Sequence, residues 1–159
     1  MTTVASTPRE LKALYPYQFT EPLISESYPR GWFPIFARLC AAIDGLLAHD
    51  KRGFKWRQVK EKQGAARFYY TLGFFGKDSD DPEQGQYVRT FKEERIAEEI
   101  ALVVRAASHL TSHTCVVCGQ AGTIQSHEGY ELAVCDAHHA QWLAGRWVQD
   151  FYLGDGLDQ

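Results

Sequence analysis

The sequence predicts an α+β protein in which a helix, a β-hairpin and a long helix precede a small module rich in cysteine and histidine. Two runs with helical spacing of apolar residues and one alternating run predict the body, and three closely spaced cysteines predict the module. A chain of 159 residues can bury a real core, and 45% apolar and 23% charged residues are ordinary for one globular domain. This composition excludes disordered, collagen-like and coiled-coil chains.

Residues 1–30 predict an irregular N-terminal arm. They hold four of the six prolines and show no sustained apolar period. Their aromatic residues indicate that the arm packs on the body. The arm lacks the basic and apolar stretches of a secretory signal, and the chain has no apolar run of roughly 18 residues, the length that crosses a membrane. We therefore expect a cytoplasmic protein with no membrane partner.

The body is expected over residues 31–111, and it begins with an amphipathic helix. From Trp32 to Leu47, apolar residues recur every three or four positions. Pro34 suits the first turn of this helix, because an N–H there would have no helical partner. Cys40 lies on the apolar face and is expected in the core.

Residues 54–75 are expected to form a β-hairpin. Large apolar residues alternate with other residues on both sides of Gly64, which stands near the turn. Val59 breaks the alternation, so the first strand should carry a bulge. A loop rich in aspartate and glycine is expected to follow over residues 76–86.

The long helix is expected to begin at Thr90. Thr90 and Glu93 match a capping box, in which each side chain accepts a hydrogen bond from the other residue's backbone N–H. Apolar residues from Ile96 to Leu110 then follow one helical face, which should pack on the core.

The strongest signal for chemistry is a pair of short motifs near the C-terminal end. Cys-Val-Val-Cys is followed, after 16 residues, by Cys-Asp-Ala-His. These residues offer three thiolates and one imidazole, a ligand set that zinc binds tetrahedrally. In a reducing compartment the thiols would be free to bind metal. The predicted zinc ligands are Cys115, Cys118, Cys135 and His138.

The module that holds these motifs is expected over residues 112–153, packed on the body as part of a single folding unit. Between the two motifs, a short hairpin is expected around Gly129. After them, apolar residues from Ala137 to Tyr152 predict a helix. The expected order is a knuckle, which is the turn that holds Cys115 and Cys118, then a hairpin and then a helix. This order resembles the treble clef of zinc modules.

Alternatives to this ligand set stay open. His139 could replace His138 as the fourth ligand, and the three cysteines could instead be buried thiols that pack as small hydrophobic residues. The remaining histidines that could serve as ligands are more simply interpreted as surface or capping residues: His109, His113 and His127.

Four protein ligands would close the site, as in structural zinc centres, whereas catalytic zinc keeps a position open for water. Nucleases of the His-Asn-His type look partly similar. In this chain, however, only His127 stands in the hairpin, where such enzymes need a pair of metal-binding residues. The phosphate loop, dinucleotide turn and nucleophile elbow are also missing from the sequence. We therefore expect no enzymatic activity and no small-molecule substrate, with a metal-dependent nuclease as the least favoured alternative.

The charge is unevenly distributed along the chain. The formal net charge is -3, but residues 51–67 hold seven basic residues and one acidic residue, a local balance of +6. The rest of the chain therefore carries -9, with acidic residues gathered over 78–83 and in the C-terminal tail. The net charge argues against a protein that coats nucleic acid with its whole surface.

Aromatic residues lie between the cations of the predicted hairpin. Such a surface could anchor and steer an acidic protein partner, or it could bind phosphates and stack the bases of single-stranded nucleic acid. It could also be an ordinary half-buried hairpin whose aromatic residues fill the core. The candidate partner-binding residues are Lys55, Trp56, Arg57, Lys60, Lys62, Arg67 and Tyr69.

Three segments together resemble a loosely defined group of short bacterial and phage proteins of unknown function: Gly31-Trp32, Val59-Lys-Glu-Lys-Gln-Gly-Ala-Ala-Arg-Phe-Tyr-Tyr70, and the two cysteine motifs. The resemblance spans most of residues 31–139. It departs at Gln63 and Ala65, where members commonly have phenylalanine and glycine. The resemblance implies a zinc-bearing accessory protein.

We therefore expect a non-enzymatic protein that engages a protein partner, as an immunity protein or a phage inhibitor would. Nucleic-acid binding through the hairpin is the alternative.

Overall fold

The computed structural model describes residues 4–48, 51, 53–73, 89–147 and 151–153. The loop expected over residues 76–86, and the acidic residues gathered in that loop and in the C-terminal tail, lie outside these ranges.

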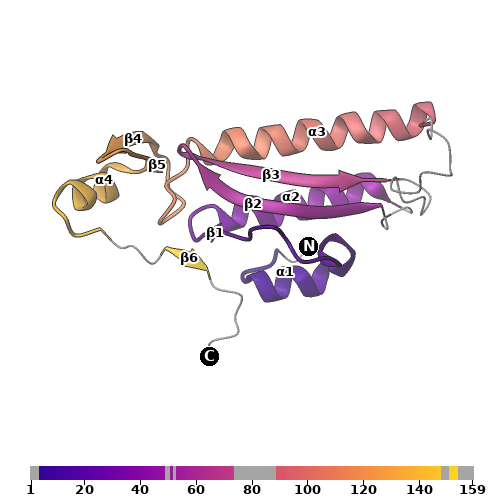
Figure 1. Ribbon diagram of the computed structural model, residues 1–159, viewed down its shortest axis with the longest axis horizontal. Coiled ribbons are helices and arrows are strands. Elements are labelled where there is room, and N and C mark those ends of the chain that lie inside the picture. Colours follow the sequence, from indigo (N-terminus) through magenta and orange to yellow (C-terminus); the bar gives the residue numbers. More distant parts are fainter. Residues whose placement is uncertain (1–3, 49–50, 52, 74–88, 148–150, 154–159) are drawn as a thin grey trace.

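The fold is α+β, as predicted. Helix α2 lies behind the β2–β3 hairpin, and helix α3 runs along β3 (Figure 1). The module extends from the end of the hairpin that carries the turn. Each sheet is an antiparallel pair. The elements of body and module are α2 (Phe33–Leu47), β2 (Phe54–Lys62), β3 (Ala65–Leu72), α3 (Phe91–Thr111), β4 (Thr123–His127), β5 (Tyr130–Val134) and α4 (Asp136–Leu143).

The N-terminal arm is more regular than predicted. It contains helix α1 (Pro8–Leu14), the 3-10 helix η1 (Pro16–Phe19) and the short strand β1 (Tyr28–Pro29). Helix α1 forms because the Thr7 side chain accepts a hydrogen bond from the Glu10 N–H, and Pro8 occupies the first turn. The expectation of an irregular arm is therefore wrong, whereas its packing on the body is confirmed.

The core of the body is built around Phe36 of α2. Its ring stacks on Phe68 of the hairpin at 5.5 Å and on Tyr28 of the arm at 5.3 Å between centroids. Trp56 tilts against the same ring at 5.1 Å. Arm, helix and hairpin therefore share one core, in which Cys40 is fully buried.

The hairpin has the turn and the bulge that the sequence predicts. Gln63 and Gly64 form the two-residue turn, with φ of 54° and 81°, as type I′ turns require. The pairing register shifts between Trp56 and Gln58, so Arg57 is the extra residue of a bulge. Beyond the bulge, Lys60 lies directly opposite Arg67.

Both edges of the hairpin are bonded to other parts of the body near the turn. On the β2 side, the Val59 N–H donates to Ser25 O at 3.0 Å. On the β3 side, the Ala66 N–H donates to the Thr111 hydroxyl of α3 at 2.8 Å. A backbone group that already has a partner is not free to pair with a strand of another chain.

Helix α3 carries the predicted capping box between Thr90 and Glu93. Ile100, Val104 and Ala107 are buried against the body core. The helix ends at Thr111, four residues before Cys115, the first cysteine of the module.

The last helix is shorter than predicted. Helix α4 ends at Leu143, and Gly145 follows with φ of 68°, a left-handed conformation that terminates helices. The expectation of a helix through Tyr152 is therefore wrong. Instead, strand β6 (Tyr152–Leu153) pairs with β1 and returns the chain to the body. No helix among the described residues is both long and apolar enough to cross a membrane.

Candidate metal centre

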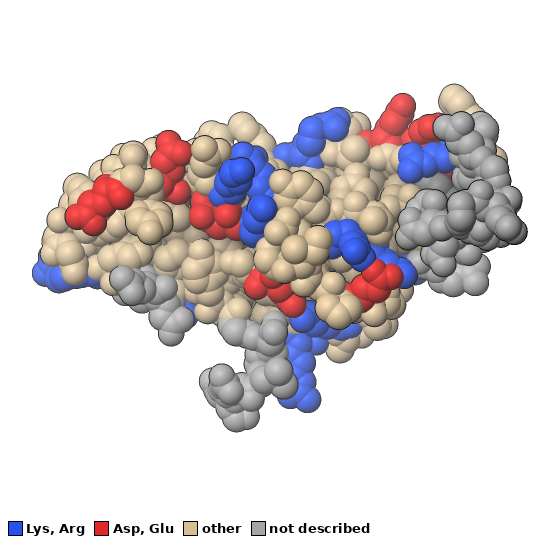
Figure 2. Space-filling model, viewed as in Figure 1, with Lys and Arg blue, Asp and Glu red and all other residues tan. Residues whose placement is uncertain are grey.

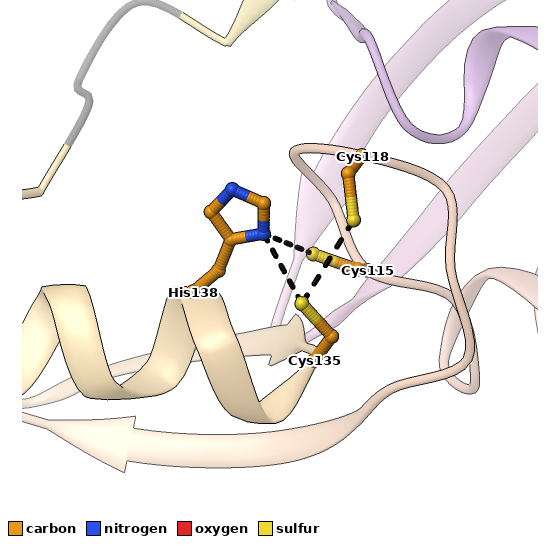
Figure 3. Close-up of side chains that lie close together, drawn as sticks. All are labelled: Cys115, Cys118, Cys135 and His138. Atoms are coloured by element: carbon orange, nitrogen blue, oxygen red, sulfur yellow. Dashed lines mark hydrogen bonds between the residues drawn. The ribbon is translucent and has the colours of Figure 1, made fainter.

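The first two cysteines of the cluster lie on a tight turn between α3 and β4. The Cys115 N–H donates to Gln120 O at 2.7 Å, and the Gly119 N–H donates to Cys115 O at 2.9 Å. Gly119 has φ of 77°, which a residue with a side chain rarely adopts. The turn brings the sulfur atoms of Cys115 and Cys118 to the same side (Figure 3).

The body supports this turn through Gly31. Its N–H donates to Val116 O at 2.9 Å. A Cβ atom at Gly31 would stand 2.0 Å from Cys115 O and 2.7 Å from Gly119 N. Only glycine therefore allows the backbone of the body to contact the turn this closely.

The other two residues come from the start of α4. Cys135 is the N-cap residue of this helix, and its carbonyl oxygen accepts the His139 N–H at 2.8 Å. His138 lies in the first turn, three residues after Cys135. Strand β5 delivers Cys135 beside the cysteine turn, because the Val116 N–H donates to Ala133 O of that strand at 2.8 Å.

The four side chains converge on one point (Figure 3). His138 Nδ1 lies 3.5 Å from Cys115 Sγ and 3.1 Å from Cys135 Sγ. Cys118 Sγ lies 3.8 Å from Cys135 Sγ. All four donor atoms fall within 4.8 Å of one another, so the cluster can hold a metal ion. It contains the four predicted ligands, and His138 rather than His139 is its histidine.

The two thiols of the turn differ in pKa. Burial opposes ionisation of Cys115, but hydrogen bonds from the backbone of Cys118, Cys135 and Val117 outweigh it and lower the pKa of this thiol. Partial desolvation raises the pKa of Cys118 to about 11, and the neighbouring Cys115 adds to the rise. Because metals bind thiolates, an ion entering the cluster would release protons.

Cys40 and the other histidines that the structure describes lie outside the cluster. Cys40 is buried in the body core, and burial raises its pKa. His113 is exposed and contacts the Ser112 hydroxyl at 2.9 Å. His127 packs edge-on against Trp142 at 5.3 Å between centroids. These positions agree with the expectation that these residues are not ligands.

On the hairpin, the structure separates the candidate partner-binding residues into three groups. Trp56 is fully buried, and its indole N–H donates to Gln18 Oε1 at 3.0 Å. Its assignment as a partner-binding residue is therefore wrong. Lys55 and Arg57 both pair with Glu21, so their charges are compensated within the chain.

The third group comprises Lys60, Lys62, Arg67 and Tyr69. Lys60 Nζ lies 5.5 Å from the centroid of the Tyr69 ring, and Tyr69 is 48% exposed. Within the described ranges, no carboxylate forms an ion pair with Lys60, Lys62 or Arg67. On the face drawn in Figure 2, basic atoms gather over the hairpin near its turn, beside acidic atoms on the module.

Sequence reasoning missed the residues that join the module to the body. The Trp32 indole N–H donates to Thr114 O at 2.8 Å, and the Trp32 ring packs in the core of the module with Phe151. The pair Gly31-Trp32 stood out in the sequence only through a resemblance. No local pattern could indicate that these two residues contact a segment more than eighty residues away.

Comparison of the chain with protein-family models, with curated proteins and with solved structures found no match.

Proposed function

We propose that the metal ion of the cluster is zinc. Zinc–sulfur bonds of about 2.3 Å and zinc–nitrogen bonds of about 2.0 Å in a tetrahedron separate two sulfur atoms by about 3.8 Å, and sulfur from nitrogen by about 3.5 Å. The Cys118–Cys135 separation is 3.8 Å and the Cys115–His138 separation is 3.5 Å. The Cys135–His138 separation of 3.1 Å is shorter and would lengthen slightly around an ion.

The proposed role of zinc is structural. Four protein donors fill a tetrahedral site and leave no position for a water nucleophile. The ion would tie the cysteine turn to α4, in a module whose core is small. The order of turn, hairpin and helix supports the resemblance to a treble clef, and the closed donor set makes nuclease chemistry the least favoured alternative.

We further propose that the protein is a non-enzymatic binding protein whose hairpin docks an acidic segment of a protein partner. The observation that carries this proposal is the placement of Lys60 directly opposite Arg67, with no carboxylate of the described residues in an ion pair with either cation. Like charges opposite each other in a β-pair destabilise the fold. A surface that keeps such a pair is well suited to a partner that supplies the negative charge.

The size of this surface favours a protein segment over nucleic acid. Binding of single-stranded nucleic acid generally uses a basic groove that follows the backbone over several nucleotides. In this hairpin, Lys55 and Arg57 are already paired with Glu21. Among the described residues of the hairpin, the cations without an ion-pair partner are Lys60, Lys62 and Arg67, which lie near the turn. The exposed Tyr69 beside them can act as an anchor.

An immunity protein or a phage inhibitor would use such a surface, and the resemblance to short bacterial and phage proteins supports either role. Both act by binding another protein with charged, aromatic surfaces and need no catalytic residues of their own.

Affinity capture from the native host tests the proposal. Wild-type protein, Lys60→Glu and Lys92→Glu should be used in parallel, because Lys92 is exposed on α3 and its change alters the net charge equally. We expect one stoichiometric protein that wild type and Lys92→Glu retain and Lys60→Glu loses. A single-stranded oligonucleotide bound at low salt, with affinity falling steeply as salt rises, would support the nucleic-acid alternative instead.

A further inference from the structure

An open cleft of about 640 Å³ lies between the turn of the β2–β3 hairpin, the module and the last described residues of the chain. Its lining includes none of the four residues of the metal cluster, and neither Lys60 nor Arg67. The residues that matter for its chemistry are Glu61, His127, Trp142, Trp147, Phe151 and Tyr152.

One wall of the cleft is a continuous run of aromatic rings. Trp142 and Trp147 lie 5.2 Å apart between centroids, Trp147 and Phe151 lie 5.7 Å apart, and Phe151 and Tyr152 lie 4.6 Å apart. The rings come from α4, from the segment after it and from β6. Aromatic faces carry negative charge and attract cations, Trp most strongly.

A carboxylate stands at the same cleft. Glu61, the penultimate residue of β2, is half-buried and accepts the Gly64 N–H at 2.9 Å. Burial raises the pKa of Glu61, while Arg67 and Glu131 act on it in opposite directions. Glu128 also lines the cleft, and no lysine or arginine does so among the described residues.

We propose that this cleft binds an arginine side chain of a protein partner. Trp147 and Tyr152 are the rings of this wall that are not buried in the module core, and they offer flat faces for a planar guanidinium. Glu61 offers carboxylate oxygens for its N–H donors. An anionic ligand would be repelled by Glu61 and Glu128. Lysine fits less well, because its compact ammonium is more strongly hydrated and cannot stack. The inference stands on the cleft alone and does not depend on the partner of the hairpin.

Titration of the zinc-loaded protein with a capped Gly-Gly-Arg-Gly-Gly peptide tests the inference. The indole N–H signals of Trp142 and Trp147, followed by NMR, should shift with a dissociation constant of about 1 mM, as expected for a small ligand. The signal of Trp56 should not move, because its indole is fully buried and bonded to Gln18. The same peptide with citrulline, which has the shape of arginine without the charge, should bind about tenfold more weakly.

Two variants localise the binding. Glu61→Gln and Trp147→Leu should each raise the dissociation constant of the arginine peptide about tenfold. Glu98→Gln removes an exposed carboxylate from α3 and should change nothing. The inference is overturned if the indole signals do not shift at about 20 mM peptide, if citrulline binds as well as arginine, or if Glu61→Gln leaves the affinity unchanged. Tighter binding of a trimethyllysine peptide would also overturn it, since the cleft would then be a quaternary-ammonium site.

Discussion

The indole N–H of Trp32 donates a buried hydrogen bond of 2.8 Å to the carbonyl oxygen of Thr114. Trp32 is the N-cap residue of α2 in the body, whereas its ring packs among residues of the module. Body and module are therefore joined by a buried contact, which should make them unfold together.

Trp32→Phe tests this coupling. The change leaves the Thr114 carbonyl without its partner in a buried place and opens space beside the ring, so we expect a loss of about 3 kcal/mol in unfolding free energy. Denaturant unfolding should be followed both by circular dichroism and by metal release. The two signals should change together in wild type and in the variant. Separate transitions would show that the module folds independently.

Gly31→Ala should undock the cysteine turn. The new Cβ would lie 2.0 Å from the Cys115 carbonyl oxygen, so the backbones must separate, at a cost of about 3 kcal/mol. Gly45→Ala is the matched control, because a Cβ at Gly45 in α2 meets nothing within 4 Å. In a helix this change should stabilise the protein by about 1 kcal/mol. Similar effects of the two substitutions in denaturant unfolding would contradict the close contact at Gly31.

Lys60→Glu should separate stability from binding. The new carboxylate would face Arg67 across the hairpin and replace repulsion with attraction, so stability should rise by about 0.5 kcal/mol. Partner capture should be lost at the same time. Thermal unfolding and binding should be measured on the same preparation. A variant that loses stability as well as binding would indicate that the hairpin had been damaged rather than its charge reversed.

Glu61→Gln should change how stability depends on pH. The folded pKa of Glu61 lies above its ordinary value of 4.5, so the folded protein holds this proton more tightly than the unfolded chain. Between the pKa of Glu61 in the unfolded chain and its higher pKa in the folded protein, this carboxyl makes the free energy of unfolding fall as pH rises. The stability of Glu61→Gln relative to wild type should therefore increase from about pH 4 towards neutrality. A difference that is constant with pH would contradict a desolvated carboxyl at this position.

Local patterns in the sequence were enough to predict the elements that depend on local rules. The capping box at Thr90, the turn at Gly64 and the bulge before Val59 all involve residues close together in the chain. The metal cluster was predictable for the same reason, since each of its two motifs fits on a single turn.

Two predictions that are wrong, the irregular arm and the long last helix, concern segments whose sequences do contain local signals. Thr7, Pro8 and Glu10 match the start of a helix, and the seven residues of α1 were too few to show a period. Gly145 marked the end of α4, but the apolar residues beyond it suggested continuation. Those residues instead fill the module core and line the cleft.

Trp56 shows a different limit. Strict alternation places Trp56 on the same face as Phe54, which is the buried face, but its cationic neighbours suggested a partner surface. The pairing of Lys55 and Arg57 with Glu21 depends on the arm, which lies more than thirty residues earlier. Contacts between distant segments therefore determine which cations of the hairpin are free of an ion pair and could contact a partner.

The metal content of the purified protein tests the central claim most directly. Elemental analysis by mass spectrometry should find about one zinc per chain in wild type and in Cys40→Ser, because Cys40 lies outside the cluster. Cys118→Ser should fall far below this ratio, since it removes one of four donors at a position exposed enough to tolerate the change. A folded wild-type protein without zinc, or equal zinc in Cys118→Ser, would contradict the account.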